Sequence, residues 1–417
     1  MLPCPNLYAE SIYETWLSVK KTNFEIKSSI KELEISEIYG KEGVADFLPN
    51  VVLDTAYQRN IVSASGVEDG DTLFMANRIS VEQKLIDMIS YQNIATLNIQ
   101  REIDSIGLLQ KVESVRYQFL KTYLETARAE QLLLLFETTY ELDLKRIEQT
   151  LESNDFIELR GAANIGFEVV RLESLKTRIV NLKSEFERSK TALFEITNAA
   201  PKKIDIDFMK IKSFSNFSNG NLRTDVSYKL LKLKRMKLGS MGKAERNMIF
   251  PTLTLFATKT WDYNYQNAVS PNRNNKDTLI GVRMSWPLTL GIRGNYRSEV
   301  ERIKEGLAGI ESNRWLSQRS QKVESLQNVY TSLEKSAGTS LNLYKRGESM
   351  LTIVRDKRDA GIISQADQLS LVISALELKS SAIETMANFS LFQVDQLYES
   401  LDLDEESIYR ISDLFKR

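Results

Sequence analysis

The chain runs through one pattern of elements twice. Residues 47–53, Phe-Leu-Pro-Asn-Val-Val-Leu, are echoed by residues 249–255, Ile-Phe-Pro-Thr-Leu-Thr-Leu, and this echo divides the 417 residues almost in half. The match continues downstream at nearly the same offset, from residues 79–81 to residues 282–284. An internal duplication of this length constrains the architecture before any single residue is interpreted, and we expect two structural repeats with the same succession of elements.

Each repeat is predicted to contain a helix, a pair of strands and a long helical hairpin. The first helix covers about residues 7–44, where Gly43 and then Pro49 end it. The expected divisions are a first repeat over 1–200, a connecting segment over 201–224, a second repeat over 225–400 and a C-terminal segment over 401–417.

The four expected strands have one apolar face. They cover about residues 51–62 and 72–83 in the first repeat, and about 252–265 and 277–287 in the second. Apolar residues alternate with polar ones along each strand, so one face of a sheet built from them is apolar and the other polar. The apolar positions are Val51, Leu53, Tyr57, Ile79, Val81, Leu253, Leu255, Ile280, Val282, Met284 and Trp286.

The helix after each strand pair is unusually long. The chain has only seven prolines, and none interrupts residues 84–152 or 292–359. At 1.5 Å per residue each helix would span on the order of 100 Å. The returning helices, after tips near 155–168 and 359–367, carry apolar residues at 3-4 spacing, which is typical of coiled coils. The helical pattern alone favours an ordinary antiparallel coiled coil.

Charge and hydropathy exclude several classes of protein. The net charge of −1 and the lack of a basic stripe argue against nucleic-acid binding. The longest apolar stretch, around residues 131–136, is far shorter than the ~20 residues of a membrane-spanning helix.

The first residues, Met-Leu-Pro-Cys, do not form a secretory signal, as expected of a processed or recombinant form. Cys4 is either a lipid-attachment site or, more simply, an unpaired thiol.

The residue inventory gives no support to an enzyme. The chain contains no histidine and one cysteine, which excludes zinc sites and histidine-based catalysis, and it has no phosphate-binding or dinucleotide-binding glycine motif. The acidic run over residues 402–406 is most simply a solvated segment. We therefore expect no catalytic residue, cofactor or metal.

Taken together, the duplicated helix, strand pair and long hairpin resemble the TolC family of outer-membrane efflux channels. Trp286-Pro287-Leu288, followed by Gly291, Arg293 and Gly294, is similar to the family's strand-to-helix junction, Pro-Leu-Phe-Asp-Gly-Gly-Arg. Thr289 and Leu290 replace its Phe-Asp, and residues 84–87 hold a more degraded copy in the first repeat. The resemblance covers most of the chain and depends on the ordered repetition more than on any motif.

The resemblance implies a mainly helical chain whose four strands join those of two other copies in a 12-stranded barrel. The helices of this homotrimer would continue the barrel as a coiled-coil tunnel in the periplasm. The implied function is a passive exit channel for drugs or exported proteins in the outer membrane of a diderm bacterium. The implied partners are a periplasmic adaptor protein, an inner-membrane pump and outer-membrane lipid.

The second tip can be compared with the family's helical turn, a glycine, five residues and then Asp-Val-Leu-Asp. Residues 360–370 fit this pattern, with Asp367 at the first pore-facing aspartate and Ser370 at the second. The resemblance thus implies one ring of three carboxylates at the entrance instead of two, and weaker attraction of cations. An acid that merely opens the return helix is the alternative for Asp367.

In the family, a tyrosine and an arginine near this tip hold the entrance closed. Their positions are Arg358 and Ile363 here, and Glu168 occupies the place of the tyrosine's aspartate partner. We infer a salt bridge between Arg358 and Glu168, worth about 0 to 1 kcal/mol at an exposed tip, and a lost link at Ile363. A solvated charge is the simpler interpretation of either charged residue alone.

The tips are also the adaptor-docking surface that the resemblance implies, represented by Gly161, Ala162, Gly361 and Ile362. Small residues allow close helix approach, although tight turns need them too. The segments 201–224 and 401–417 would form an equatorial belt around the helices. The alternative function is a periplasmic coiled-coil adaptor or scaffold, but adaptors usually carry one hairpin, whereas this chain has two.

Overall fold

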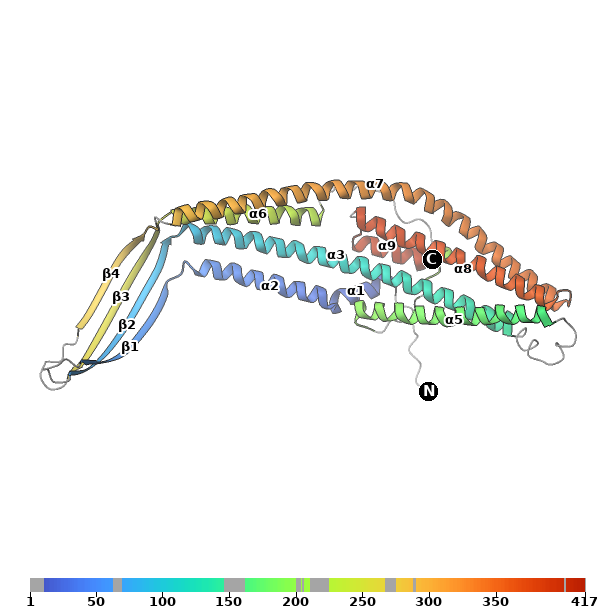
Figure 1. Cartoon of the computed structure of the whole chain (residues 1–417), viewed down its shortest axis with the longest axis horizontal. Helices are drawn as coiled ribbons and strands as arrows, with labels where there is room; N and C mark the ends of the chain where they lie inside the picture. The colour runs from blue at the N-terminus through green and yellow to red at the C-terminus, as the bar shows by residue number, and fades with distance from the viewer. Residues whose placement is uncertain are drawn as a thin grey trace. The chain divides into compact units, whose positions relative to one another are not determined.

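A computed structural model describes residues 11–62, 70–145, 162–199, 204, 206–210, 225–266, 275–287, 290–400 and 403–416. Its elements follow the order expected from the duplication (Figure 1). The elements of the first half are α1 (Ile12–Thr22), α2 (Phe24–Ala45), β1 (Asn50–Val62), β2 (Gly70–Ile86), α3 (Met88–Thr139), the π-helix η1 (Tyr140–Leu144) and α5 (Ala162–Thr197). The remaining elements are the 3₁₀-helix η3 (Phe208–Lys210), α6 (Val226–Arg246), the 3₁₀-helix η5 (Asn247–Ile249), β3 (Thr252–Gln266), β4 (Asn275–Ser285), α7 (Leu290–Asp359), α8 (Gln365–Ser400) and α9 (Glu405–Lys416).

The chain packs into two compact units, and both sequence repeats contribute to each. The first unit contains the described parts of 1–30, 108–228 and 314–417, and the second those of 31–107 and 229–313. The division into repeats stays a prediction about the sequence, because the packing groups elements of both repeats together.

A four-stranded antiparallel sheet in the second unit has the order β1-β2-β3-β4. Its register places Leu53 opposite Ile79, and Leu255 opposite Val282, so these apolar side chains share one face. That face is open: Leu53, for example, is 67% exposed. β4 ends at Ser285, before Trp286 and Pro287. The expected fold class, mainly helical with four strands per chain, is confirmed.

The predicted first helix is in fact two helices, because Asn23 interrupts it. The side chain of Asn23 accepts hydrogen bonds from the backbone N–H groups of Glu25 and Ile26 at 3.0 and 3.2 Å, which caps the start of α2. Its amide also donates to the carbonyl oxygen of Ile196 at 3.0 Å, which ties this break to the end of α5. Asn23 therefore redirects the chain where periodicity alone predicted continuous helix.

The long helices are present where the lack of proline allowed them. α3 covers Met88–Thr139 and continues into η1, and α7 covers Leu290–Asp359 without interruption. None of the helices within the described ranges is long and apolar enough to cross a membrane.

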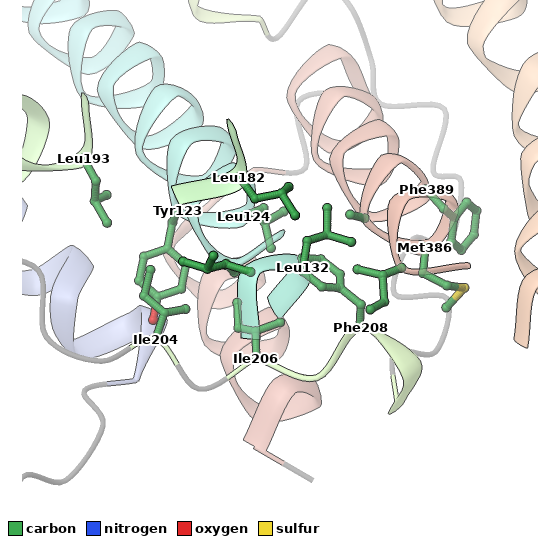
Figure 2. Packing of buried hydrophobic residues seen from close by; sticks show 14 of the residues in the cluster. Tyr123, Leu124, Leu132, Leu182, Leu193, Ile204, Ile206, Phe208, Met386 and Phe389 are labelled. Carbon is green, nitrogen blue, oxygen red and sulfur yellow. The ribbon is translucent and has the colours of Figure 1, made fainter. Parts of the chain in front are cut away.

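The hydrophobic core of the first unit lies where α3, α5 and α8 pack together. The residues at the predicted 3-4 spacing are buried there, including Leu172, Leu182, Leu193, Leu369, Leu376 and Ile383. Three residues of the connecting segment join them: Figure 2 shows Ile204, Ile206 and Phe208 directed into the same cluster as Tyr123 and Leu124 of α3. A short stretch between the repeats thus covers the helices with apolar side chains.

Candidate functional site

The turn between α7 and α8 is a tight helix reversal made possible by a glycine. Gly361 has φ of +68°, a conformation that residues with a Cβ rarely adopt. Its N–H donates to the carbonyl oxygen of Arg358 at 2.9 Å, and the N–H of Ile362 donates to that of Lys357 at 3.0 Å. These two bonds form a Schellman motif, which satisfies the last carbonyls of α7. Ile362 is left 76% exposed at the turn.

Ser364 and Asp367 together start α8. The hydroxyl of Ser364 accepts a hydrogen bond from the backbone N–H of Asp367 at 3.2 Å and donates to the carboxylate of Asp367. Ser364 is therefore the N-cap, and the acid three residues later faces the positive end of the helix. Asp367 is exposed. The local structure accounts for its position, and exposure leaves its carboxylate available to solvent.

A groove of about 530 Å³ lies between α5 and α8, where Phe136 of α3 also lines it. Ser370, the position of the family's second aspartate, is one of its lining residues and is half-buried. The lining combines hydroxyl, charged and large apolar side chains: Phe136, Arg171, Ser174, Leu175, Arg178, Ser370, Ile373, Ser374, Leu376, Glu377 and Ser380.

A buried ion-pair cluster joins the end of α3 to the last turns of α7. Asp143 lies in η1 and is 1% exposed. Arg355 donates to both of its oxygens, from Nε at 2.9 Å and from Nη2 at 2.6 Å. Arg358 places Nη1 3.5 Å from Asp143 Oδ1 and also pairs with Asp359 at 3.0 Å. The hydrogen bonds to Asp143 raise the pKa of Arg355, although burial opposes this shift.

Asp143 lies in a single π-helical turn. One wider turn shifts the side chains that follow it relative to a regular α-helix, and such turns are frequent at functional sites. Two arginines then face one buried carboxylate, so the cluster carries an excess of positive charge that Asp359 offsets from the exposed side. Among the described residues, no group of His, Cys, Asp and Glu side chains is arranged to hold a metal ion.

Comparison with solved structures shows where this architecture occurs. The outer-membrane channel CmeC of Campylobacter jejuni superposes on 99% of the chain and 90% of its own length, with a TM-score of 0.79 at 12% sequence identity. The outer-membrane protein VceC of Vibrio cholerae aligns with 93% of the chain and 95% of its own length, with a TM-score of 0.71 at 13% identity. The chain has the TolC-like fold.

The open-state MtrE channel of Neisseria gonorrhoeae is also similar, over 94% of the chain and 88% of its own length, with a TM-score of 0.66 at 13% identity. No model of a known protein family matches the sequence, and no curated protein matches it. The resemblance inferred from the ordered repetition is thus confirmed by the fold, at an identity where sequence comparison finds nothing.

Within this TolC-like fold, the predicted gate residues are only partly described. The described partners of Arg358 are Asp143 and Asp359, and Ile363 is half-buried beside the turn. Gly161 and the side chains of Ala162 and Glu168 lie outside the described residues, so the pair between Arg358 and Glu168 stays a prediction.

Sequence reasoning missed Asp143, although a signal was available. Leu132, Phe136 and Thr139 form a stripe of buried positions on α3 at 3-4 spacing, and Asp143 continues it. An acid at such a position requires a cation, because an unpaired buried charge costs several kcal/mol. This pattern would have indicated that Asp143 has a cationic partner, but it would not have identified the residue.

Proposed function

We propose that this protein is the outer-membrane exit channel of a tripartite efflux or type I secretion system, a passive conduit and not an enzyme. The observation that carries the proposal is the alignment of nearly the whole chain with solved outer-membrane channels. The open apolar face of the sheet supports it independently. Leu53, Ile280 and Met284 would be costly to expose to water, but they suit contact with lipid.

The sheet and its neighbouring helices support a homotrimer. In the described sheet β1 and β4 are the edge strands, and four strands are too few to close around a channel. An exposed apolar stripe runs along α7 in the same unit, with side chains that are 50 to 74% exposed: Ile292, Tyr296, Val300, Ile303, Leu307 and Ile310. Exposed apolar residues also lie on α2, namely Ile35, Ile38, Tyr39 and Val44.

These two apolar faces suit each other in a ring of three copies. If β4 of one copy pairs with β1 of the next, twelve strands close one barrel with no free edge, and α7 meets α2 of the neighbour. Burial of these residues of α7 and α2 would then remove their exposed apolar side chains from water. The helices would form the tunnel beneath the barrel, in the periplasm.

The proposed partners are a periplasmic adaptor protein and an inner-membrane pump. The tip residues Gly361 and Ile362 are accessible for docking, and Gly161 and Ala162 are proposed for the same surface from sequence. The groove that Ser370 lines lies between α5 and α8. Energy for transport would come from the pump.

The Asp143 cluster is proposed to hold the entrance closed. Because Arg355 and Arg358 lie just before the second tip, their bonds to α3 restrain the end of α7 against the first hairpin. Opening would require the end of α7 to move away from Asp143. The exposed Asp367 would add one ring of three carboxylates at the entrance, and a salt bridge between Arg358 and Glu168 would add a weaker restraint.

The test is the mass of the purified protein in detergent together with its conductance in a planar bilayer. A trimer that forms discrete channels supports the proposal. The competing function, a periplasmic coiled-coil adaptor, predicts a protein that stays in solution without detergent and gives no conductance. That outcome would overturn the channel assignment.

A further inference from the structure

A buried aspartate stands at the start of α6 with half of its carboxylate unpaired. Asp225 caps the helix, since its Oδ1 accepts the backbone N–H of Ser227 at 2.6 Å. The side chain is only 3% exposed, and its Oδ2 has no hydrogen-bond partner. A buried carboxylate oxygen without a donor is destabilising. Among the described residues, no donor reaches this oxygen.

The nearest face of α3 carries a second carboxyl group. Gln110 donates from Nε2 to the hydroxyl of Ser227 at 3.3 Å, so this face of α3 lies against the first turn of α6. Glu113 follows Gln110 by one turn on the same face. Burial raises the pKa of Glu113, and the charge of Asp225 raises it further. Glu113 and Asp225 therefore both lie at the contact of α3 with the start of α6, near enough for the charge of Asp225 to act on Glu113.

The hydrogen bonds that the neighbouring cations make go to other groups, although the Nε atoms of Arg116 and Arg319 are buried without a partner among the described residues. Arg319 of α7 pairs with Glu399 of α8 and donates to the carbonyl oxygen of Tyr398 at 3.1 Å. Lys322 pairs with the other oxygen of the same Glu399. Arg116 of α3 donates to the carbonyl oxygen of Leu403 at 2.5 Å. Within the described part of the chain, neither Glu113 nor Asp225 makes an ion pair.

We propose that Glu113 and Asp225 share one proton and together form a pH-dependent anchor between α3 and the start of α6. In the protonated state the carboxyl O–H of Glu113 donates to the vacant Oδ2 of Asp225, which gives that oxygen its missing donor. In the deprotonated state two carboxylates face each other without a shared proton, and their repulsion weakens the contact.

The direction of the pH dependence follows from the surroundings. Burial raises the pKa of Asp225, as it does that of Glu113, and the positive charge of Arg319 opposes the shift in both. Arg116 also lowers the pKa of Glu113, while Glu399 raises that of Asp225. Both carboxyl groups therefore bind protons more strongly in the folded protein. The anchor forms as the pH falls and is lost as the pH rises through the raised pKa of the pair.

Hydrogen exchange of the first turns of α6, measured on the full-length protein in detergent, tests the anchor. Wild-type protein would be compared with Glu113→Gln at about pH 5 and at about pH 8. The amide of glutamine donates to Asp225 at every pH, so this variant mimics the protonated state. Glu137→Gln, which removes an exposed carboxylate from α3, is the matched control.

We expect wild type and Glu113→Gln to exchange alike at the lower pH. At the higher pH wild type should exchange faster than Glu113→Gln, by about tenfold for each unit by which the pKa of the pair is raised. Asp225→Asn, which keeps a helix cap, should also remove the pH-dependent difference, whereas Glu137→Gln should follow wild type. Equal exchange of wild type and Glu113→Gln at both values, or faster exchange of the variant, would overturn the anchor.

The inference rests on the proposed function only in placing the anchor in the periplasm, where it would respond to the pH of that compartment. Its test has a readout separate from transport. A protein that conducts but shows no pH-dependent exchange would contradict the anchor alone. A protein that shows pH-dependent exchange but does not conduct would contradict the channel function alone.

Discussion

Arg355 holds both oxygens of the buried Asp143 carboxylate, with Nε 2.9 Å from Oδ1 and Nη2 2.6 Å from Oδ2. The two residues are 212 positions apart in sequence and belong to different hairpins. This planar, two-bond arrangement is the strongest geometry available to an arginine and a carboxylate. It makes Arg355 the principal polar link between Asp143 and the end of α7, with Arg358 as a longer second contact.

Replacing Arg355 with methionine should leave Asp143 buried with only Arg358 nearby. Because one charge of a buried pair is then uncompensated, we expect the free energy of unfolding to fall by about 2 to 4 kcal/mol. The free energy of unfolding of Arg355→Lys should lie between those of wild type and Arg355→Met, since lysine keeps the charge but loses the two-bond geometry. Denaturant unfolding measures the change, and Arg346→Met on the exposed face of α7 is the control.

The same variant separates stability from gating. If the cluster closes the entrance, Arg355→Met should raise the open probability in planar bilayers, whereas Arg346→Met should not. Replacing both partners, with Asp143→Leu and Arg355→Met, should recover much of the lost stability, because a buried pair can be exchanged for apolar residues. A double variant that is stable and still closed like wild type would show that the cluster is structural only.

The main outline of this fold could be predicted from the sequence because the duplication presents it twice. The Phe-Leu-Pro-Asn echo located the strands, and the lack of proline located α3 and α7. Local chemistry was harder to predict. Asn23 looked like part of a helix because its capping bonds depend on the backbone bend that it creates, and its third bond goes to Ile196.

The contacts of the candidate site could be predicted only where the two residues lie close together in the sequence. Ser364 and Asp367 lie three residues apart, so their helix-capping contact follows from spacing. The partner of Arg358 could not be chosen from spacing, because Asp143 and Glu168 are both distant in sequence and only packing decides between them. The π-helix that carries Asp143 also lacks any recognised sequence signal here.

Asp367 and Ser364 allow a test of the two roles of the tip. Ser364→Ala removes the cap and should reduce stability by about 1 kcal/mol without changing ion selectivity. Asp367→Asn should reduce stability by less, since the cap hydroxyl remains, but should lower the preference for cations if three copies form a ring. Reversal potentials in a salt gradient measure this preference.

Asp356→Asn, an exposed acid on α7 before the turn, is the matched control for charge. If Asp356→Asn and Asp367→Asn alter the reversal potential equally, the ring at the entrance is not the source of selectivity.

Leu307 tests the proposed contact between copies. Leu307→Asp places a charge in the apolar stripe of α7, where burial of an unpaired carboxylate costs several kcal/mol. We expect the mass in detergent to shift from trimer to monomer. Asn295→Asp adds the same charge to α7 outside the stripe and should leave the trimer intact. A stable Leu307→Asp trimer would place the interface elsewhere.

Asp87 gives a pH-dependent prediction at the start of α3. Its carboxylate accepts the backbone N–H groups of Ile89 and Ser90 at 3.1 and 3.2 Å, and Lys84 lies 3.2 Å away. Burial alone would raise the pKa of Asp87, but the hydrogen bonds from Ser90 and the contact with Lys84 outweigh it and hold the pKa below its ordinary value of 3.8. The folded protein therefore favours the ionised form.

The cap should consequently stabilise α3 fully above the ordinary pKa and lose its effect as the pH falls through the lower folded value. Asp87→Ala should weaken the first turns of α3 by about 1 to 2 kcal/mol at neutral pH, measured as faster hydrogen exchange there than in wild type. Under acid conditions the difference in hydrogen exchange between Asp87→Ala and wild type should shrink, because wild type then loses its own ionised cap.

Two variants serve as controls. Asp87→Asn should retain most of the protection of the first turns of α3, and Glu102→Ala, at an exposed site on α3, should exchange like wild type. A difference between Asp87→Ala and wild type that stays constant with pH would assign the effect to lost packing and not to charge.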